Sequence, residues 1–156
     1  MDASEARARL DETGEAILVG VERCLPGWVE REVERILDAW GRVPATARDR
    51  ARRDARAAGR AATDRVLHGL RTLFAAAPAE QRATPLEIVR GAYREPTQLL
   101  RDLGVPPVER DAFDERAWPD DRYGLVPRSL ADIGDESLGP LLLAWGLAKA
   151  RAIRPD

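Results

Sequence analysis

The sequence predicts an all-α protein, a single-domain bundle of four to five main helices with a long ordered strap before the C-terminal helix. Apolar residues recur at steps of three and four along most of the chain, which is the spacing of an amphipathic helix. Residues 46–77 contain no proline and are expected to form one long helix. The composition is 44% hydrophobic and 33% charged over 156 residues, a balance typical of a globular domain with a buried core. We therefore expect one domain over residues 1–156, with N-terminal helices in 1–104, the strap in 105–135 and the C-terminal helix in 136–154.

Residues 2–24 predict the first helix. Asp2 and Glu5 have the spacing of a capping box at its start. An apolar stripe follows at steps of seven, four and three residues: Leu10, Ile17, Val21 and Cys24. Gly14 and Gly20 each weaken a helix by ~1 kcal/mol relative to alanine. We therefore expect this helix to be the least stable of the long helices and to pack on the outside of the bundle.

Pro26 is expected to end the first helix and to open the second, residues 26–41, because proline fits the first turn of a helix. This is the cleanest amphipathic pattern in the chain, with an apolar face of Val29, Val33, Ile36, Leu37 and Trp40. The other face carries an acidic row of Glu30, Glu34 and Asp38. Gly41 ends the helix, and the short link through Pro44 predicts that the next helix is its antiparallel neighbour.

The long helix at 46–77 is the centre of the predicted bundle. Thr46 is a suitable cap, with Asp49 at the third position. The first half has a seam of small residues along one side: Ala51, Ala55, Ala58 and Ala62. Four arginines lie roughly opposite: Arg52, Arg53, Arg56 and Arg60. The alanine seam permits close packing on a neighbouring helix, which leaves the arginine side to face water or a partner.

Residues 85–103 predict the next helical segment. Thr84, Pro85 and Glu87 provide a capping threonine, a proline at the first helical position and a glutamate at the third. We expect Pro96 to break this segment, and a shorter helix to restart there and to end at Gly104.

Residues 105–135 predict a strap that is held against the bundle. The segment is rich in proline and in acidic residues, and a loop this long is unusual inside a compact domain. Large apolar side chains are available to anchor it: Phe113, Trp118, Tyr123, Leu125 and Val126. We expect short helical turns near 111–116 and 128–133.

The last helix is expected to follow Asp135 or Ser137 and to run to about Ile153. It is apolar nearly all round, with Leu141, Leu142, Leu143, Trp145 and Leu147. A helix of this kind either lies centrally in the core or forms part of a subunit interface.

Several short phrases of the sequence are similar to those of a known group of bacterial proteins. They are Thr84-Pro85-Leu86, Pro96-Thr97, Gly104-Val105-Pro106-Pro107, Pro119-Asp120-Asp121, Tyr123-Gly124-Leu125 and Trp145-Gly146. In these phrases residues 84–150 resemble a group of small uncharacterised helical proteins from high-GC Gram-positive bacteria, for which no activity is known. The resemblance implies a bacterial cytoplasmic protein and no particular chemistry. Codon bias of such a genome would also explain why Lys149 is the only lysine among the 25 basic residues.

The residues that common active sites require are scarce. Cys24 is the only cysteine and His68 the only histidine, which excludes a cysteine-built metal site and argues against a nucleophile triad. The sequence has no Glu-x-x-His pair of a di-iron bundle, no calcium-loop spacing and no phosphate-binding glycine motif. We therefore expect no metal, no cofactor and no catalytic residue. The enzymatic alternative uses carboxylates of the strap: Asp111, Asp114, Glu115, Asp120 and Asp121.

Charge is distributed unevenly along the chain, although the formal net charge is only −2. Residues 48–71 carry eight arginines against three aspartates, a local charge of +5. Residues 102–122 carry seven acidic residues against three arginines, a local charge of −4. The arginines are therefore either neutralised within the chain, by the strap or the acidic row, or left open to a partner.

We predict a non-catalytic binding or adaptor protein that presents a charged helix face, Arg52, Arg53, Arg56 and Arg60, to a macromolecule. The expected partner is another protein or a second copy of the chain, which would make a homodimer. The alternative is weak, sequence-independent nucleic-acid binding, in which the same arginines contact phosphates. That alternative lacks stacking aromatic residues between Thr46 and Leu73.

No segment has the pattern of an export signal or a membrane span. The N-terminal stretch is charged and lacks an apolar core. The longest apolar run, residues 138–148, contains glycine and proline and is well short of the ~20 residues that a membrane helix requires. We expect a cytoplasmic protein with no membrane partner.

Overall fold

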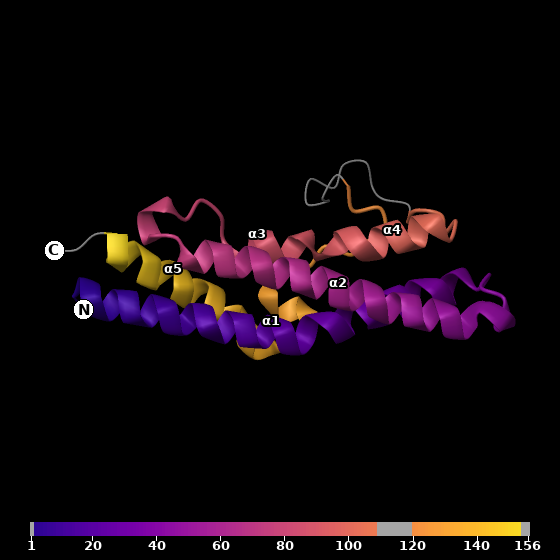
Figure 1. Cartoon of the computed structure of the whole chain (residues 1–156), viewed down its shortest axis with the longest axis horizontal. Coiled ribbons are helices and arrows are strands. Elements are labelled where there is room, and N and C mark those ends of the chain that lie inside the picture. The colour runs from indigo at the N-terminus through magenta and orange to yellow at the C-terminus, as the bar shows by residue number, and fades with distance from the viewer. Residues whose placement is uncertain (1, 109–119, 154–156) are drawn as a thin grey trace.

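The computed structural model describes residues 2–108 and 120–153. Within these ranges every regular element is helical (Figure 1). The α-helices are α1 (Ala3–Trp40), α2 (Arg48–Ala75), α3 (Pro85–Arg90), α4 (Arg94–Asp102) and α5 (Gly139–Ile153), with short 3₁₀ turns between them. The predicted all-α bundle is confirmed.

α1 and α2 form a long antiparallel hairpin that gives the molecule its elongated shape (Figure 1). Their interface is the most extensive contact between helices. α5 packs along α1, and α3 and α4 pack against α2. The start of α1 and the end of α5 lie at the same tip of the bundle (Figure 1).

The expected helix break at Pro26 is wrong, because α1 runs through this residue as one helix. An internal proline removes one backbone hydrogen bond and costs ~3 kcal/mol. The apolar stripe nevertheless keeps one phase on both sides of the proline, with Leu25 in place of the predicted Cys24, which is only half-buried. The members of this stripe are almost fully buried: Leu10, Ile17, Val21, Leu25, Val29 and Val33. Each such side chain contributes roughly 1.5–3 kcal/mol when buried, so the continuous helix outweighs the proline cost. The expectation that the first part of this helix packs outside the core is wrong for the same reason.

Gly14 and Gly20 make close contacts that helix propensity does not reveal. Both glycines are buried in α1. A Cβ atom at Gly14 would lie 3.2 Å from the ring of Phe74 on α2, and one at Gly20 would overlap the side chain of Leu138. The two glycines therefore let α2 and the turn before α5 approach α1 closely.

Thr46 does not cap the long helix, which begins at Arg48. The chain enters α2 through a 3₁₀ turn at Ala45–Ala47, in which the N–H of Ala47 donates to the carbonyl of Pro44 at 2.9 Å. This backbone turn occupies the entry to the helix, and no side chain caps it.

The alanine seam of α2 is present with one change. Ala51, Ala55 and Ala62 are buried, and Gly59 is buried instead of Ala58, which is only half-buried. A Cβ atom at Gly59 would lie 2.6 Å from the carbonyl oxygen of Pro26. The two long helices therefore touch through their backbones at this point.

The segment after Thr84 begins as predicted but breaks earlier than predicted. The Thr84 hydroxyl accepts a hydrogen bond from the N–H of Glu87 at 3.3 Å. The α-helical pattern is interrupted by a 3₁₀ turn at Gly91–Tyr93, whereas Pro96 is buried in the first turn of α4. Proline has no N–H and its ring crowds the carbonyl four residues earlier, so the irregular turn precedes it.

The described part of the strap is fastened to the bundle by buried side chains: Val105, Tyr123, Leu125, Leu130 and Ile133. The hydroxyl of Tyr123 donates to the carbonyl of Val105 at 2.8 Å, and the N–H of Val108 donates to the carbonyl of Arg122 at 2.9 Å. The turn predicted near 128–133 is present as a 3₁₀ helix at Leu130–Ile133. The turn predicted at 111–116 lies outside the described residues, as do Phe113 and Trp118.

α5 is held to the bundle by one face. Within it only Trp145 and Ala148 are buried. The ring of Trp145 packs against Phe74 with 6.3 Å between centroids, and the Lys149 ammonium lies 5.1 Å from the Trp145 ring centre. α5 is therefore not the central helix of the core.

The outer face of α5 is apolar and exposed. Leu143 is 69% exposed and Leu147 is 57% exposed. Gly146 and Ala150, which lie on the same side, are also exposed. Among the described residues, no helix combines the length and the apolar character needed to cross a bilayer.

Candidate functional site

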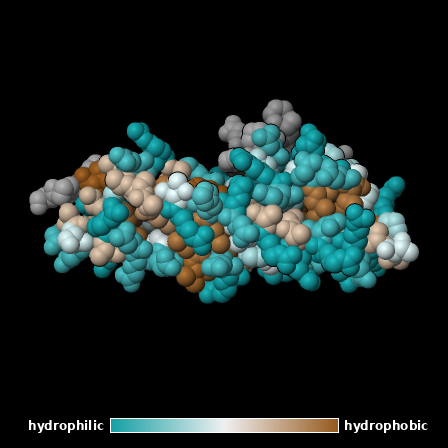
Figure 2. All heavy atoms as spheres, in the orientation of Figure 1, coloured by the Kyte–Doolittle hydropathy of each residue, from teal (hydrophilic) through white to brown (hydrophobic). Residues whose placement is uncertain are grey.

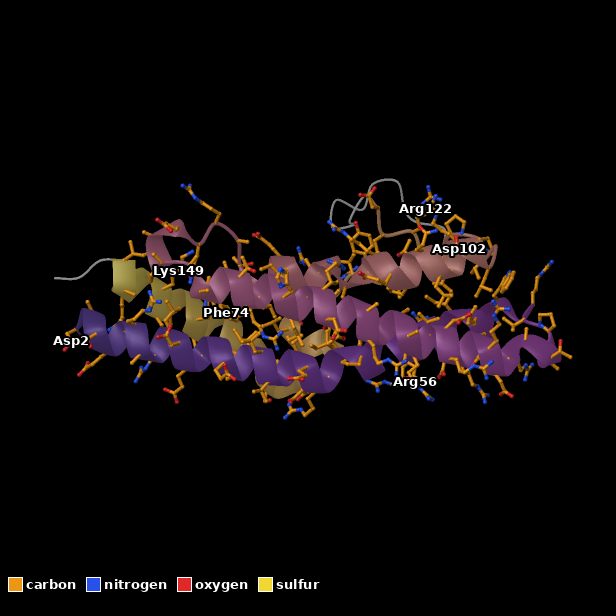
Figure 3. The ribbon with its side chains drawn as sticks, in the orientation of Figure 1. Asp2, Arg56, Phe74, Asp102, Arg122 and Lys149 are labelled. Carbon is orange, nitrogen blue, oxygen red and sulfur yellow. The ribbon has the colours of Figure 1, made fainter. Side chains whose placement is uncertain are left out.

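The arginine face of α2, defined as Arg52, Arg53, Arg56 and Arg60, is exposed at all four positions. Its orientation follows from the seam, because burying Ala51 and Ala55 against α1 turns the arginines outward. Arg56 points away from α3 and α4 (Figure 3). The structure therefore brings the predicted partner-binding residues together on one open surface.

The acidic row of α1 neutralises this face only in part. Arg56 forms an ion pair with Glu30, with 3.6 Å between Nε and Oε1. Arg52 shares a cavity of about 170 Å³ with Glu34 and Asp38, but makes no ion pair with either carboxylate. Arg52, Arg53 and Arg60 have no ion pair with any residue in the described part of the chain.

Arg65 belongs to the same basic stretch of sequence but has a structural role. Its guanidinium donates to both carboxylate oxygens of Glu95, at 2.5 and 2.9 Å, and also to the carbonyl of Gly91. The hydrogen bond to Glu95 raises the pKa of Arg65 above its ordinary value. Arg65 therefore joins α2 to α4, and its guanidinium is already paired within the chain.

The strap carboxylates do not form the acidic pocket that the enzymatic alternative requires, as far as they are described. Asp121 is buried, and its two oxygens accept hydrogen bonds from the N–H groups of Leu125 and Val126 at 2.6 and 3.0 Å. This arrangement holds a turn of the strap. Asp111, Asp114 and Glu115 lie outside the described residues, so the alternative remains a prediction for them.

A basic pocket lies between α4 and the strap, and the sequence analysis did not identify it. We call it the strap pocket; its volume is about 310 Å³, and residues lining it include Tyr93, Arg94, Thr97, Arg101, Asp120 and Arg122. Arg122 lies on the strap above α4 (Figure 3). Arg94, Thr97 and Arg101 follow each other at steps of three and four, so helical spacing alone places them on one face of α4. Only the fold reveals that Arg122 joins them.

Two of these arginines lie near enough to Tyr123 to affect the pKa of its phenol. Burial raises the pKa of the Tyr123 phenol above its ordinary value, while the nearby charges of Arg122 and Arg101 act in the opposite direction. Arg94, Arg101 and Arg122 make no ion pair within the described ranges. Counting the described residues only, the strap pocket therefore has three arginines without an ion pair beside one carboxylate, that of Asp120.

A third surface combines apolar side chains with four charged ones, Arg42, Arg50, Asp54 and Asp102. Trp40, Val43, Leu99 and Leu103 line a hollow of about 520 Å³ between α4 and the connection from α1 to α2. Figure 2 shows a hydrophobic patch at this end of the bundle, surrounded by hydrophilic side chains.

Metal-binding groups do not gather in the described part of the structure. No three histidine, cysteine or carboxylate side chains there are placed to hold a metal ion. His68 is exposed on α2, and Cys24 is half-buried on α1.

No protein-family model, curated protein or solved structure matches this chain. The resemblance of residues 84–150 to small helical proteins of high-GC Gram-positive bacteria therefore stays a prediction.

Proposed function

We propose that this protein is a non-catalytic binding or adaptor protein, and that the arginine face of α2 receives an acidic segment of a protein partner. The observation that carries the proposal is that Arg52, Arg53 and Arg60 are exposed and unpaired within the described residues. A guanidinium has a rigid set of donors that matches a carboxylate in two-point geometry. Three such groups on one helix offer a partner contacts that the described part of the chain leaves unused.

The helix that carries these arginines is a firm platform. Ala55 and Ala62 on its inner side are fully buried, and Gly59 brings its backbone against α1. The four arginines span about 12 Å along the axis, at ~1.5 Å per residue. A rigid platform lowers the ordering cost of binding, because only the arginine side chains must become fixed.

An acidic protein segment fits this surface better than a nucleic acid does. The whole chain carries a formal net charge of −2, which opposes approach to a polyanion outside the arginine face. No aromatic residue between Thr46 and Leu73 is available to stack on bases. Nucleic-acid binding is nevertheless retained as the alternative that the experiment below decides.

The experiment compares two variants from which the same charge has been removed. The test variant replaces all four residues of the arginine face by glutamine. The matched control replaces four exposed arginines elsewhere by glutamine: Arg9, Arg71, Arg82 and Arg128. Binding of a fluorescent glutamate-rich peptide and of a fluorescent DNA oligonucleotide is measured by anisotropy at low and moderate salt.

We expect the wild-type protein to bind the acidic peptide and the control variant to bind it with nearly the same affinity. The test variant should bind the peptide about tenfold or more weakly, and a tenfold loss corresponds to ~1.4 kcal/mol of binding free energy. Equal losses in the two variants would contradict the proposal, because they would report net charge alone. Tighter binding of DNA than of peptide, with a steep salt dependence, would favour the nucleic-acid alternative.

Self-association through α5 is a second candidate, favoured by a specific observation. The exposed leucines Leu143 and Leu147 are one helical turn apart, and Gly146 and Ala150 beside them are small enough for another helix to approach. Two copies of this face related by a twofold axis would cover each other's leucines. We propose the bacterial cytoplasm as the setting, following the resemblance described above.

A further inference from the structure

The hydroxyl of Thr97 is buried and has no hydrogen-bond partner. Thr97 is 7% exposed, and its Oγ1 atom lacks a partner within the described part of the structure. Other helical threonines avoid this situation: the hydroxyls of Thr13, Thr63 and Thr72 donate to the carbonyl four residues earlier, at 2.8, 2.7 and 3.0 Å. A buried hydroxyl without a partner is destabilising, so its persistence calls for a group that completes it.

The unpaired hydroxyl lines the strap pocket, where three arginines also make no ion pair with the described residues. Arg94 and Arg101 flank Thr97 on α4, and Arg122 faces them from the strap. Two hydrogen bonds hold the strap backbone at Arg122. The carbonyl of Arg122 accepts from the N–H of Val108, and the hydroxyl of the next residue, Tyr123, donates to the carbonyl of Val105. Hydroxyl and guanidinium donors thus gather around one space of about 310 Å³ with an excess of positive charge.

We propose that the strap pocket binds the phosphate group of a small molecule. Arg101 and Arg122 would neutralise the phosphate charge, and the Thr97 hydroxyl would donate to one of its oxygens. Phosphate is favoured over a carboxylate because its oxygens can accept from several guanidinium groups and a hydroxyl at once. The volume lies at the small end of the range for ligand pockets, about 300–1,000 Å³, which suits a phosphate with a short organic group. The proposal concerns α4 and the strap, so it stands or falls independently of the arginine face of α2.

The test uses the full chain and four probes at constant ionic strength: inorganic phosphate, pyrophosphate, glycerol phosphate and acetate. Binding is measured by isothermal titration calorimetry, and the melting temperature is measured without ligand. The test variants are Thr97→Val and Arg101→Gln. Matched controls are Thr72→Val, whose hydroxyl is already bonded to the carbonyl of His68, and Arg71→Gln, an exposed arginine on α2.

We expect at least one phosphate probe to bind saturably to the wild-type protein. The same probe should bind about tenfold or more weakly to both test variants and with unchanged affinity to both control variants. A preference for glycerol phosphate over the inorganic probes would indicate an ester, and the reverse preference would indicate free phosphate. Thr97→Val should also raise the melting temperature of the free protein, because valine keeps the shape of threonine and removes the unpaired hydroxyl.

Three results would overturn the proposal. The first is the absence of saturable binding for all the phosphate probes. The second is acetate binding as tight as that of phosphate, which would show a site selective only for negative charge. The third is that Thr97→Val binds phosphate with wild-type affinity or has a lower melting temperature than the wild-type protein. Either result would show that the Thr97 hydroxyl is not an unpaired donor for phosphate.

Discussion

At the residue scale, Gly59 is the point at which the backbones of the two long helices come into contact, and no pattern in the sequence indicates this contact. Its position on α2 faces the Pro26 carbonyl oxygen of α1, and a Cβ atom there would lie 2.6 Å from that oxygen. Alanine has a higher helix propensity than glycine, but at this site it would push two backbones apart. Gly146 on α5 is the opposite case, because a Cβ atom there would meet nothing within 4 Å.

The same substitution should therefore have opposite effects at these two glycines. Gly59→Ala should lower the free energy of unfolding by about 1–3 kcal/mol, because the helices must separate to admit the methyl group. Gly146→Ala should raise it by about 0.4–1 kcal/mol through the lower entropy of the unfolded chain. Urea denaturation of both variants measures the difference. Stabilisation by Gly59→Ala would show that the close approach does not constrain the packing.

Two of the three helix caps predicted from local spacing are present, and the third, Thr46, is not. The carboxylate of Asp2 accepts from the N–H of Glu5 at 2.8 Å, and Thr84 caps α3 as expected. These caps depend only on residues three apart. The unpaired hydroxyl of Thr97 was out of reach of the sequence analysis, because its surroundings depend on where the strap crosses α4.

At the element scale, the continuity of α1 shows which of two local signals prevails. Pro26 is a helix-breaking signal, and the apolar stripe in one phase is a helix-extending signal. The proline acts at one position, whereas the stripe is repeated on both sides of it and is buried along α2 and α5. The outcome depends on tertiary burial, and propensity at the proline alone therefore gave the wrong prediction.

The short turn before α5 is an element whose stability should depend on pH. Asp135 accepts hydrogen bonds from the hydroxyl and the N–H of Ser137, at 2.6 and 2.9 Å, and pairs with Arg23 of α1. The bonds to Ser137, with a smaller effect of Arg23, lower the pKa of Asp135 from its ordinary value of 3.8. Because the pKa of this carboxyl is lower in the folded than in the unfolded protein, its ionised form stabilises the fold at any pH above the unfolded-state pKa. This stabilisation is lost as the pH falls through the folded-state pKa.

Asp135→Asn should therefore lower the melting temperature at neutral pH, and its deficit relative to wild type should shrink as the pH falls below about 4. Thermal unfolding followed by circular dichroism over a pH series measures the two curves. Asp64→Asn is the control, because Asp64 makes no hydrogen bond or ion pair with the described residues. If the melting temperature of Asp135→Asn stays below that of the wild type by the same amount down to acid pH, the ionised Asp135 carboxylate is not the source of the stabilisation.

At the scale of the whole molecule, the exposed apolar face of α5 is what a second copy of the chain would cover. The sequence left open whether this apolar helix is central or lies at a subunit interface. The structure excludes the central position, because α5 packs by one face and leaves Leu143 and Leu147 open. Exposed leucines in a row favour association with another surface.

We expect the protein to be a dimer whose dissociation depends on concentration, and the double variant Leu143→Gln, Leu147→Gln to be a monomer. Light scattering after size-exclusion chromatography over a range of concentrations measures the mass. Val108→Gln is the matched control, because Val108 is 54% exposed and lies on the strap, away from α5. A monomeric wild type, or a control that dissociates as readily as the double variant, would remove self-association from the proposed function.

The charge of the strap shows why the site was only partly predictable. The sequence predicts an acidic strap, and it correctly predicts that the arginine face of α2 lies on one side of a helix. The structure turns the Asp121 carboxylate inward to hold a turn and places Arg122 beside arginines of α4. Among the described residues, the strap pocket therefore holds three arginines and one carboxylate, although residues 102–122 carry a local charge of −4.

The sequence by itself determined the all-α class, the arginine face of α2 and the caps of α1 and α3, because each follows from periodicity or from neighbours a few residues apart. Only the tertiary structure decided that α1 continues through Pro26, that α5 lies at the surface and that a basic pocket forms beneath the strap. These features depend on which distant segments meet, and on whether burial there outweighs a local preference of ~3 kcal/mol or less.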